Sequence, residues 1–259
     1  MSAVISMTDL HKTYVMGRNQ VHALRGIDIE VEQGKIISLI GANGAGKTTV
    51  FNLITGNYRP DEGDVIFDGR SIKTLPTHKI VSLGIARTFQ TIRLFQKLAA
   101  IENVLAGCHC RMQSGSLAAM FRTPAQRREE HEALQTALKE LEFVGLQSQA
   151  DQLAENLSYG NQRLLDIARA LATQPRFIIL DEPAGGMNNQ ETAALIQTIR
   201  NIRDRGITVL LIEHDMSLVM EACEQLVVIE NGAKIAEGTP QAIQSDPKVI
   251  EAYLGTDEE

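Results

Sequence analysis

The sequence predicts an α/β fold in which a parallel β-sheet is combined with a smaller antiparallel sheet and a helical insert. Two continuous apolar runs, residues 177–180 and 208–212, have the composition of strands that are buried on both faces of a parallel sheet. Alternating apolar and polar residues over 3–15 and 27–33 favour an antiparallel sheet near the N-terminus. Between about residues 93 and 164 the apolar residues instead follow helical spacing, which indicates the insert.

A glycine-rich segment follows the apolar run 36–40 and has the pattern of a phosphate-binding loop. Its residues are Gly41, Ala42, Asn43, Gly44, Ala45, Gly46, Lys47 and Thr48, and we expect Thr49 to join them in binding nucleotide. The glycines let backbone N–H groups turn toward phosphate oxygens, and the helix that follows adds the positive end of its dipole. Lys47 can reach the β- and γ-phosphates, and Thr48 can offer its hydroxyl to Mg²⁺. A turn that only joins strand to helix would not explain the Lys-Thr pair.

Shorter patterns complete the predicted sheets and the insert. Residues 64–69 predict a strand and a turn, and residues 226–236 predict a hairpin around Asn231 and Gly232. Two helices and a loop are predicted in the insert, at residues 97–107, 124–144 and 111–123 respectively. One face of the second helix is expected to be formed by Ala133, Leu134, Ala137, Leu138 and Leu141.

Composition narrows the class of protein. The 259 residues include 25 basic and 32 acidic side chains, and the formal net charge of −7 argues against a nucleic-acid partner. Three cysteines are too few for a disulfide framework, and Cys108-His109-Cys110 lacks the second ligand pair of a metal site. No apolar run approaches the roughly 18 residues of a membrane span, and no signal-peptide pattern is present, so we expect a cytosolic chain.

Polar residues follow the predicted strands in a pattern that suits phosphate chemistry. Asp181, at the end of the run 177–180, can hold Mg²⁺ through water, and Glu182 can orient and deprotonate an attacking water. His214, after the next apolar run, can hydrogen-bond to a γ-phosphate. The amide of Gln90 can contact both Mg²⁺ and the attacking water. Two surface acids, an ordinary histidine and an ordinary glutamine are the alternatives when each motif is taken alone.

The motif Leu157-Ser158-Tyr159-Gly160-Asn161-Gln162 precedes a helical run over 163–171. Ser158 is expected to cap that helix, which leaves backbone N–H groups at its start available to an anion. An ordinary helix cap is the alternative interpretation of the same residues.

Taken in order, these motifs resemble the ATPase subunit of an ABC transporter over nearly the whole chain. The resemblance implies ATP and Mg²⁺ as ligands and ATP hydrolysis as the reaction. It implies that Tyr14 stacks on adenine. Mg²⁺ would be held by Thr48, Gln90 and Asp181. Hydrolysis would depend on Glu182, His214 and Gln90.

The implied fold is a P-loop NTPase, the ABC ATPase fold, in which a RecA-like core carries an antiparallel β subdomain. We expect one ABC ATPase domain over residues 1–259. Its expected parts are the core with the β subdomain at 1–92 and 165–240, a helical signature subdomain at 93–164, and a C-terminal helix and tail at 241–259.

The family mechanism implies a head-to-tail dimer, in which Ser158 and Gly160 of one subunit contact the ATP of the other. ATP would close the dimer, and hydrolysis would open it. The chain departs from the common family pattern at Tyr159, where glycine is usual, at Asn161, where glutamine is usual, and at Asn188, where aspartate is typical.

A finer resemblance is to the ATPases of branched-chain amino acid importers, the Liv type. The segments that carry it are residues 87–90, 93–95, 101–104, 182–188, 212–216, 238–240 and 253–255, together with Tyr159. This resemblance implies two transmembrane permease subunits, a periplasmic solute-binding protein and a second ABC ATPase. It implies a peripheral place on the cytoplasmic face of the inner membrane.

Two other functions remain open at this point. The ATPase of lipopolysaccharide export is similar in length and shares the His-Asp pair, although it usually keeps a regular Leu-Ser-Gly-Gly motif. A soluble ABC ATPase of DNA repair or translation usually carries two cassettes or a long coiled-coil insert. A nucleotide-binding adaptor without catalysis is disfavoured by Glu182.

Overall fold

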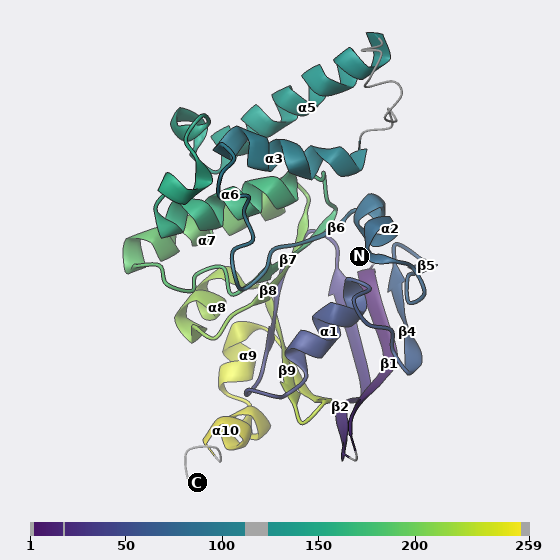
Figure 1. Cartoon of the computed structure of the whole chain (residues 1–259). Coiled ribbons are helices and arrows are strands. Elements are labelled where there is room, and N and C mark those ends of the chain that lie inside the picture. The colour runs from purple at the N-terminus through teal and green to yellow at the C-terminus, as the bar shows by residue number, and fades with distance from the viewer. Residues whose placement is uncertain (1–2, 18, 112–123, 255–259) are drawn as a thin grey trace.

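The computed structural model describes residues 3–17, 19–111 and 124–254, and these form two β-sheets with helices packed around them (Figure 1). Nearly all of the loop predicted over 111–123 lies outside the described residues, as do residues 255–259 of the predicted tail. The larger sheet has the strand order β10-β9-β3-β8-β7-β6, and all neighbouring strands run parallel except β10 and β9. Its strands are β3 (Ile36–Ile40), β6 (Ile85–Arg87), β7 (Phe177–Asp181), β8 (Thr208–Ile212), β9 (Gln225–Glu230) and β10 (Ala233–Gly238). The predicted parallel strands and the C-terminal hairpin are therefore confirmed.

The smaller sheet is antiparallel and has the order β2-β1-β4-β5. Its strands are β1 (Ala3–Met16), β2 (Asn19–Glu32), β4 (Glu62–Phe67) and β5 (Arg70–Ser71). The antiparallel sheet predicted near the N-terminus is confirmed, but its second strand begins earlier than residue 27. A main-chain hydrogen bond from Arg25 N in β2 to Gly232 O ties this sheet to the turn between β9 and β10, and Gly232 N in turn donates to Ala45 O of the segment that follows β3.

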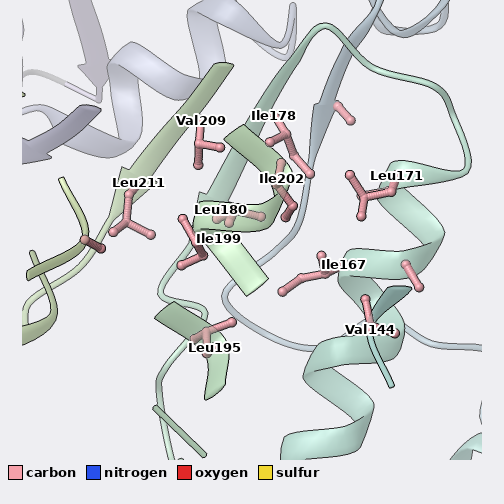
Figure 2. Packing of buried hydrophobic residues seen from close by; sticks show 14 of the residues in the cluster. Val144, Ile167, Leu171, Ile178, Leu180, Leu195, Ile199, Ile202, Val209 and Leu211 are labelled. Carbon is pink, nitrogen blue, oxygen red and sulfur yellow. The ribbon is translucent and has the colours of Figure 1, made fainter. Parts of the chain in front are cut away.

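The parallel strands alternate their side chains between two separate apolar clusters, one on each face of the larger sheet. On one face Ile37, Ile179 and Leu210 pack against helix α1 (Lys47–Ile54) and the antiparallel sheet. On the other face lie Ile178, Leu180, Val209 and Leu211, and Figure 2 shows them packed against Leu195, Ile199 and Ile202 of α7 (Asn189–Asp204) and against Ile167 of α6 (Tyr159–Leu171). Burial on both faces explains why these strands are continuously apolar.

The helical insert lies at one end of the molecule, beyond the edge strand β6 (Figure 1). It contains α3 (Ala100–Cys108) and α5 (Pro124–Phe143), which pack against each other and against α6. In the described residues the other helices are α2 (Thr77–Leu83), α8 (Met216–Ala222), α9 (Pro240–Gln244) and α10 (Pro247–Leu254), and the short 3₁₀ segments are His109–Arg111, Gln147–Gln149 and Ala154–Asn156. The expected boundary between residues 164 and 165 falls within α6.

One expected apolar face is narrower than the sequence suggested. In α5 the side chains of Ala137 and Leu141 are buried and Ala133 packs against the core, whereas Leu134 and Leu138 are 39% and 36% exposed. The buried positions are spaced four residues apart, so they form a single stripe that contacts α3 and α6. Leu134 and Leu138 lie about 100° further around the helix and therefore reach the rim of the contact.

None of the helices in the described part of the chain combines the length and the apolar character that crossing a bilayer requires.

Candidate nucleotide site

The phosphate-binding loop and three further loops meet where the parallel strands end. In a parallel sheet all strands end at the same edge, so segments that are distant in sequence converge there. The phosphate-binding loop follows β3, Gln90 follows β6, Glu182 follows β7 and His214 follows β8. Together they line a cavity of about 650 Å³. Among the predicted residues, the cavity is lined by Asn43, Gly44, Ala45, Gly46, Lys47, Thr48, Thr49, Gln90, Asp181, Glu182 and His214.

Two glycines allow the phosphate-binding loop to pass close to its neighbours. A Cβ on Gly41 would lie 2.1 Å from Ile229 O, and a Cβ on Gly46 would lie 2.7 Å from Ala23 O. Gly46 also has a φ of +108° at the N-terminus of α1, a backbone conformation that residues other than glycine rarely adopt. The loop can therefore hold this shape only with glycine at these positions.

Lys47 is folded back onto the loop that carries it. Its Nζ donates hydrogen bonds to Gly41 O at 2.5 Å and to Ala42 O at 3.0 Å. Burial lowers the pKa of the Lys47 ammonium, and the negative charge of Glu182 opposes that effect. Both carbonyl partners are neutral, so a phosphate oxygen would be a stronger acceptor for the same ammonium.

Glu182 is the centre of the polar side chains on the opposite wall. Its Oε2 accepts from Nε2 of Gln90 at 2.6 Å, and its Oε1 lies 2.9 Å from Nε2 of His214. Glu182 has a φ of +45°, a strained backbone conformation of the kind that clusters at functional sites. Its main chain is fixed by the hydrogen bond from Glu182 N to Ile212 O at 2.9 Å.

Asp181 is held by a cation that the sequence motifs did not identify. Nη2 of Arg87 lies 2.7 Å from Oδ2 of Asp181, and Nη1 of the same guanidinium donates to Oδ1 of Asn52 in α1. The Thr88 hydroxyl also accepts a hydrogen bond from Asp181 N. The edge strand β6 thus braces the end of β7. The signal was present in the sequence, since Arg87 and Thr88 stand three and two residues before Gln90.

The side chains available to Mg²⁺ fit its chemistry. A threonine hydroxyl, a carboxylate and an amide oxygen line the same cavity, from Thr48, Asp181 and Gln90. Oxygen donors of this kind are those that Mg²⁺ prefers. Nε2 of Gln90 is used in the contact with Glu182, so Oε1 is the atom of that amide that remains for a cation.

Different elements form another part of the cavity wall. Val21, His22, Ala23 and Arg25 of β2 line it, with Asn231 from the turn between β9 and β10. Tyr14 does not line the cavity. It pairs with Val21 across β1 and β2, and its ring packs edge-on against Tyr58 with 5.4 Å between ring centroids.

Ser158 and Gly160 also lie outside the cavity lining. The Ser158 hydroxyl caps α6 by accepting from Asn161 N, as the sequence predicted. A Cβ on Gly160 would lie 2.7 Å from Oε1 of Glu191, and a Cβ on Gly186 would lie 2.9 Å from the Tyr159 ring. The start of α6 is therefore packed closely against the segment that follows Glu182.

Two buried charged residues of the site region were missed by motif reasoning. Arg163 of α6 donates to Phe89 O and to the Tyr159 hydroxyl, so it joins the start of α6 to the residue before Gln90. Glu213 lies next to His214 with its side chain buried. A carboxylate placed between an apolar strand and a histidine was the only sequence signal for it.

Comparison with known proteins gives a family for this arrangement. A family model described as ABC transporter matches residues 24–185, and one described as branched-chain amino acid ATP-binding cassette transporter matches residues 233–259. The high-affinity branched-chain amino acid transport ATP-binding protein BraF of Pseudomonas aeruginosa is 49% identical over 90% of this chain and 92% of its own length. The lipopolysaccharide export system ATP-binding protein LptB of Acidithiobacillus ferridurans is less similar, at 35% identity over 98% of both chains.

Solved structures agree with the sequence relatives. The ADP conformation of MJ1267, an ATP-binding cassette of an ABC transporter, has a TM-score of 0.84 and 34% identity, covering 98% of this chain and all of that one. A dimeric post-hydrolysis state of the cassette MJ0796, bound to ADP and phosphate, has a TM-score of 0.77 and 25% identity, covering 91% of this chain and 98% of that one. The chain therefore belongs to the ATP-hydrolysing subunits of ABC transporters, and within them to the branched-chain amino acid group.

Proposed function

We propose that this chain hydrolyses ATP to energise the uptake of branched-chain or related amino acids, as a peripheral subunit on the cytoplasmic face of the inner membrane. The names of relatives such as BraF support this substrate class. The observation that best supports hydrolysis is the position of Glu182, whose carboxylate contacts both Gln90 and His214 on the wall of the cavity that also contains Lys47.

In this proposal the phosphates of ATP lie along the loop from Gly41 to Thr49. Lys47 exchanges its neutral carbonyl partners for oxygens of the β- and γ-phosphates. Thr48, Gln90 and Asp181 would hold Mg²⁺, which when bound would offset negative charge on those phosphates. Arg87 keeps the Asp181 carboxylate at the end of β7.

The proposed hydrolysis step uses the three polar side chains on the opposite wall. Glu182 accepts a proton from water as the water oxygen bonds to the γ-phosphorus, and the bond from that phosphorus to the bridging oxygen of ADP breaks. Gln90 orients the water. An N–H of the His214 imidazole, which contacts Glu182 in this structure, donates to an oxygen of the γ-phosphate.

We propose further that two ATPase subunits close head to tail, either two copies of this chain or one copy and a related ATPase. Ser158 and Gly160 would then contact the ATP held by the other subunit, where the N-terminus of α6 favours negative charge. Their exclusion from the lining of this chain's own cavity is consistent with that role. The cassette MJ0796 is dimeric in its solved structure, which supports the pairing of two ATPase subunits.

A second surface suits the permease subunits that an importer requires. A groove of about 350 Å³ beside Gln90 is lined mainly by apolar side chains and includes Phe89, Phe95 and Cys110. Phe95 is 54% exposed, an unusual position for a large apolar residue. Because the groove adjoins Gln90, a permease segment bound there would be next to a residue that contacts Glu182.

Cys110 provides a test of this groove. Of the three cysteines, Cys108 and Cys223 are buried and Cys110 is exposed. We expect a maleimide to label Cys110 in the isolated chain and to react much more slowly in the complex with the permeases. The matched control is Cys110→Ser, which should remove the labelling. Equal labelling rates in the chain and in the complex would exclude this docking site.

The proposal also includes the partners of the chain and its division into parts. The partners are two permeases and a periplasmic solute-binding protein. The parts are a core with a β subdomain, a helical subdomain and a C-terminal segment.

Reconstitution of the ATPase with its partners in lipid vesicles tests the proposed transport function. With permeases and binding protein present, we expect leucine, isoleucine or valine to stimulate ATP hydrolysis and to accumulate inside. Lys47→Ala is the control that should do neither. Stimulation by a lipid-linked glycan instead of amino acids would favour the export alternative.

A further inference from the structure

Glu213 is a buried carboxylate whose partners come from two different loops. Only 6% of the surface of this residue is exposed to solvent. Oε1 accepts from Ala184 N at 2.9 Å, and Oε2 accepts from His214 N at 3.2 Å. Ala184 stands two residues after Glu182, so the two oxygens of one side chain contact the two segments that carry Glu182 and His214.

Backbone N–H groups replace the cation that a buried carboxylate usually requires. In the residues that the structure describes, no lysine, arginine or histidine side chain forms an ion pair with Glu213. Burial raises the pKa of Glu213, the main-chain N–H groups oppose that effect, and the negative charge of Glu182 adds to it. Burying a carboxylate costs free energy, and the main-chain hydrogen bonds to Glu213 offset part of that cost.

The geometry around Glu213 indicates a role beyond packing, which is to link two loops. The loops after β7 and β8 are joined once through the main chain, by the bond from Glu182 N to Ile212 O, and again through the Glu213 carboxylate. The same two loops are in contact through Nε2 of His214, which lies 2.9 Å from Oε1 of Glu182. The link through Glu213 and Ala184 lies outside the lining of the nucleotide cavity.

We propose that Glu213 is a positioning residue for hydrolysis, which holds the loop of Glu182 and the loop of His214 at a fixed separation. This inference rests on the roles proposed above for Glu182 and His214. Oε1 makes the link between the loops by accepting from Ala184 N, while Oε2 accepts from His214 N within the loop that carries Glu213 itself. A glutamine at this position has the same shape but only one acceptor, and its NH₂ group would face one of the two N–H donors.

The first test is Glu213→Gln in the chain with its permeases. We expect kcat for ATP to fall by about tenfold to a hundredfold, the size of effect that a small misplacement of catalytic groups produces. KM and the affinity for ATP should change by less than about twofold, since Glu213 does not line the nucleotide cavity. The matched control is Glu221→Gln, an exposed acid on α8 that pairs with Arg200, and its kcat should not change.

A double-mutant cycle separates positioning from a general loss of stability. If Glu213 acts by placing His214 against Glu182, Glu213→Gln should reduce single-turnover hydrolysis by less than about threefold when His214→Ala is already present. An equal reduction in both backgrounds, together with a lower thermal midpoint, would overturn the inference. Normal kcat in Glu213→Gln would also overturn it.

A replacement variant and two control variants distinguish failure of the positioning role from failure of the proposed function. If Glu213→Gln does not fold, Glu213→Asp takes its place in the same cycle, because it keeps both acceptor oxygens on a shorter side chain. If Glu182→Gln and His214→Ala both hydrolyse ATP at the normal rate, the proposed function of the site is wrong. If those two variants are impaired and Glu213→Gln is normal, only the positioning role is wrong.

Discussion

The wall of the nucleotide cavity has two parts, named here the phosphate end and the hairpin end, which are built in different ways. At the phosphate end, the loop after β3 and the residues after β6, β7 and β8 all follow strands of the buried parallel sheet. At the hairpin end, the cavity is lined by β2 of the antiparallel sheet and by the turn at Asn231. Val21 at that end is 45% exposed.

This difference shows where precision comes from in the site. Strands buried on both faces cannot shift without opening the core, so their ends hold the proposed catalytic groups at fixed distances, as between Glu182 and His214. An exposed hairpin has fewer packing partners and tolerates change at its surface. We therefore expect substitutions at the phosphate end to have large effects on binding or hydrolysis, and substitutions at the other end to have small ones.

Lys47→Ala should have the largest effect. It removes the only ammonium that the described cavity lining contributes, and each charge-assisted hydrogen bond contributes about 1.5–3 kcal/mol. With two such bonds to phosphate lost, ATP affinity should fall by at least about a hundredfold, and hydrolysis should cease. Calorimetric titration with ATP measures this, with the exposed Lys79→Ala as control. If the ATP affinity of Lys47→Ala stayed within a few-fold of that of the parent chain, the expected large effect at the phosphate end would be contradicted.

Glu182→Gln should separate binding from chemistry at the same end. The amide cannot accept a proton from water, so kcat should fall by the roughly 10²–10⁴-fold that general-base catalysis contributes. Affinity for ATP should stay close to that of the parent chain, and light scattering should detect a dimer that persists in ATP. Near-normal turnover would mean that another group removes the proton.

The phosphate end was also the part of the site that the sequence predicted best. A glycine loop after an apolar run, and carboxylates after another, are local patterns, and the parallel sheet brings them together by topology alone. The fold followed from the same runs. The antiparallel sheet was predicted as well, although β2 was expected to be shorter.

Other features depend on tertiary packing and could not be read from local pattern. Arg87 and Asp181 are far apart in sequence and meet only because β6 and β7 are neighbours. The buried Glu213 depends on a contact with Ala184 from another loop. The exposure of Leu134 and Leu138 depends on how wide a contact α5 makes with α3 and α6. The position of Tyr14 relative to the cavity depends on the hairpin of β1 and β2.

Arg87→Gln measures how firmly the phosphate end is braced. The pair with Asp181 is largely buried, with side-chain exposures of 10% and 14%, so removing one partner leaves a carboxylate without its strongest hydrogen bond. We expect the free energy of unfolding to fall by about 1–3 kcal/mol, which lowers the thermal midpoint by several degrees. Arg200→Gln breaks a more exposed pair with Glu221 and should leave the midpoint nearly unchanged. Similar shifts in both variants would show that the Arg87 brace is no stronger than a surface pair.

Tyr14→Ala should have the smallest effect, because it changes the exposed end. If the ring stacks on adenine, its loss should weaken ATP affinity by about 1 kcal/mol, the lower end of what base–aromatic stacking contributes, or about fivefold. kcat should not change, because the base lies away from Glu182. Val21→Ala is the informative companion, since Val21 pairs with Tyr14 across the hairpin and lines the cavity where Tyr14 does not. A larger loss for Tyr14→Ala than for Val21→Ala would mean that the hairpin turns its aromatic ring toward the base when ATP binds. A loss for Val21→Ala alone would mean that β2 itself forms the base end and that the stacking role of Tyr14 is wrong.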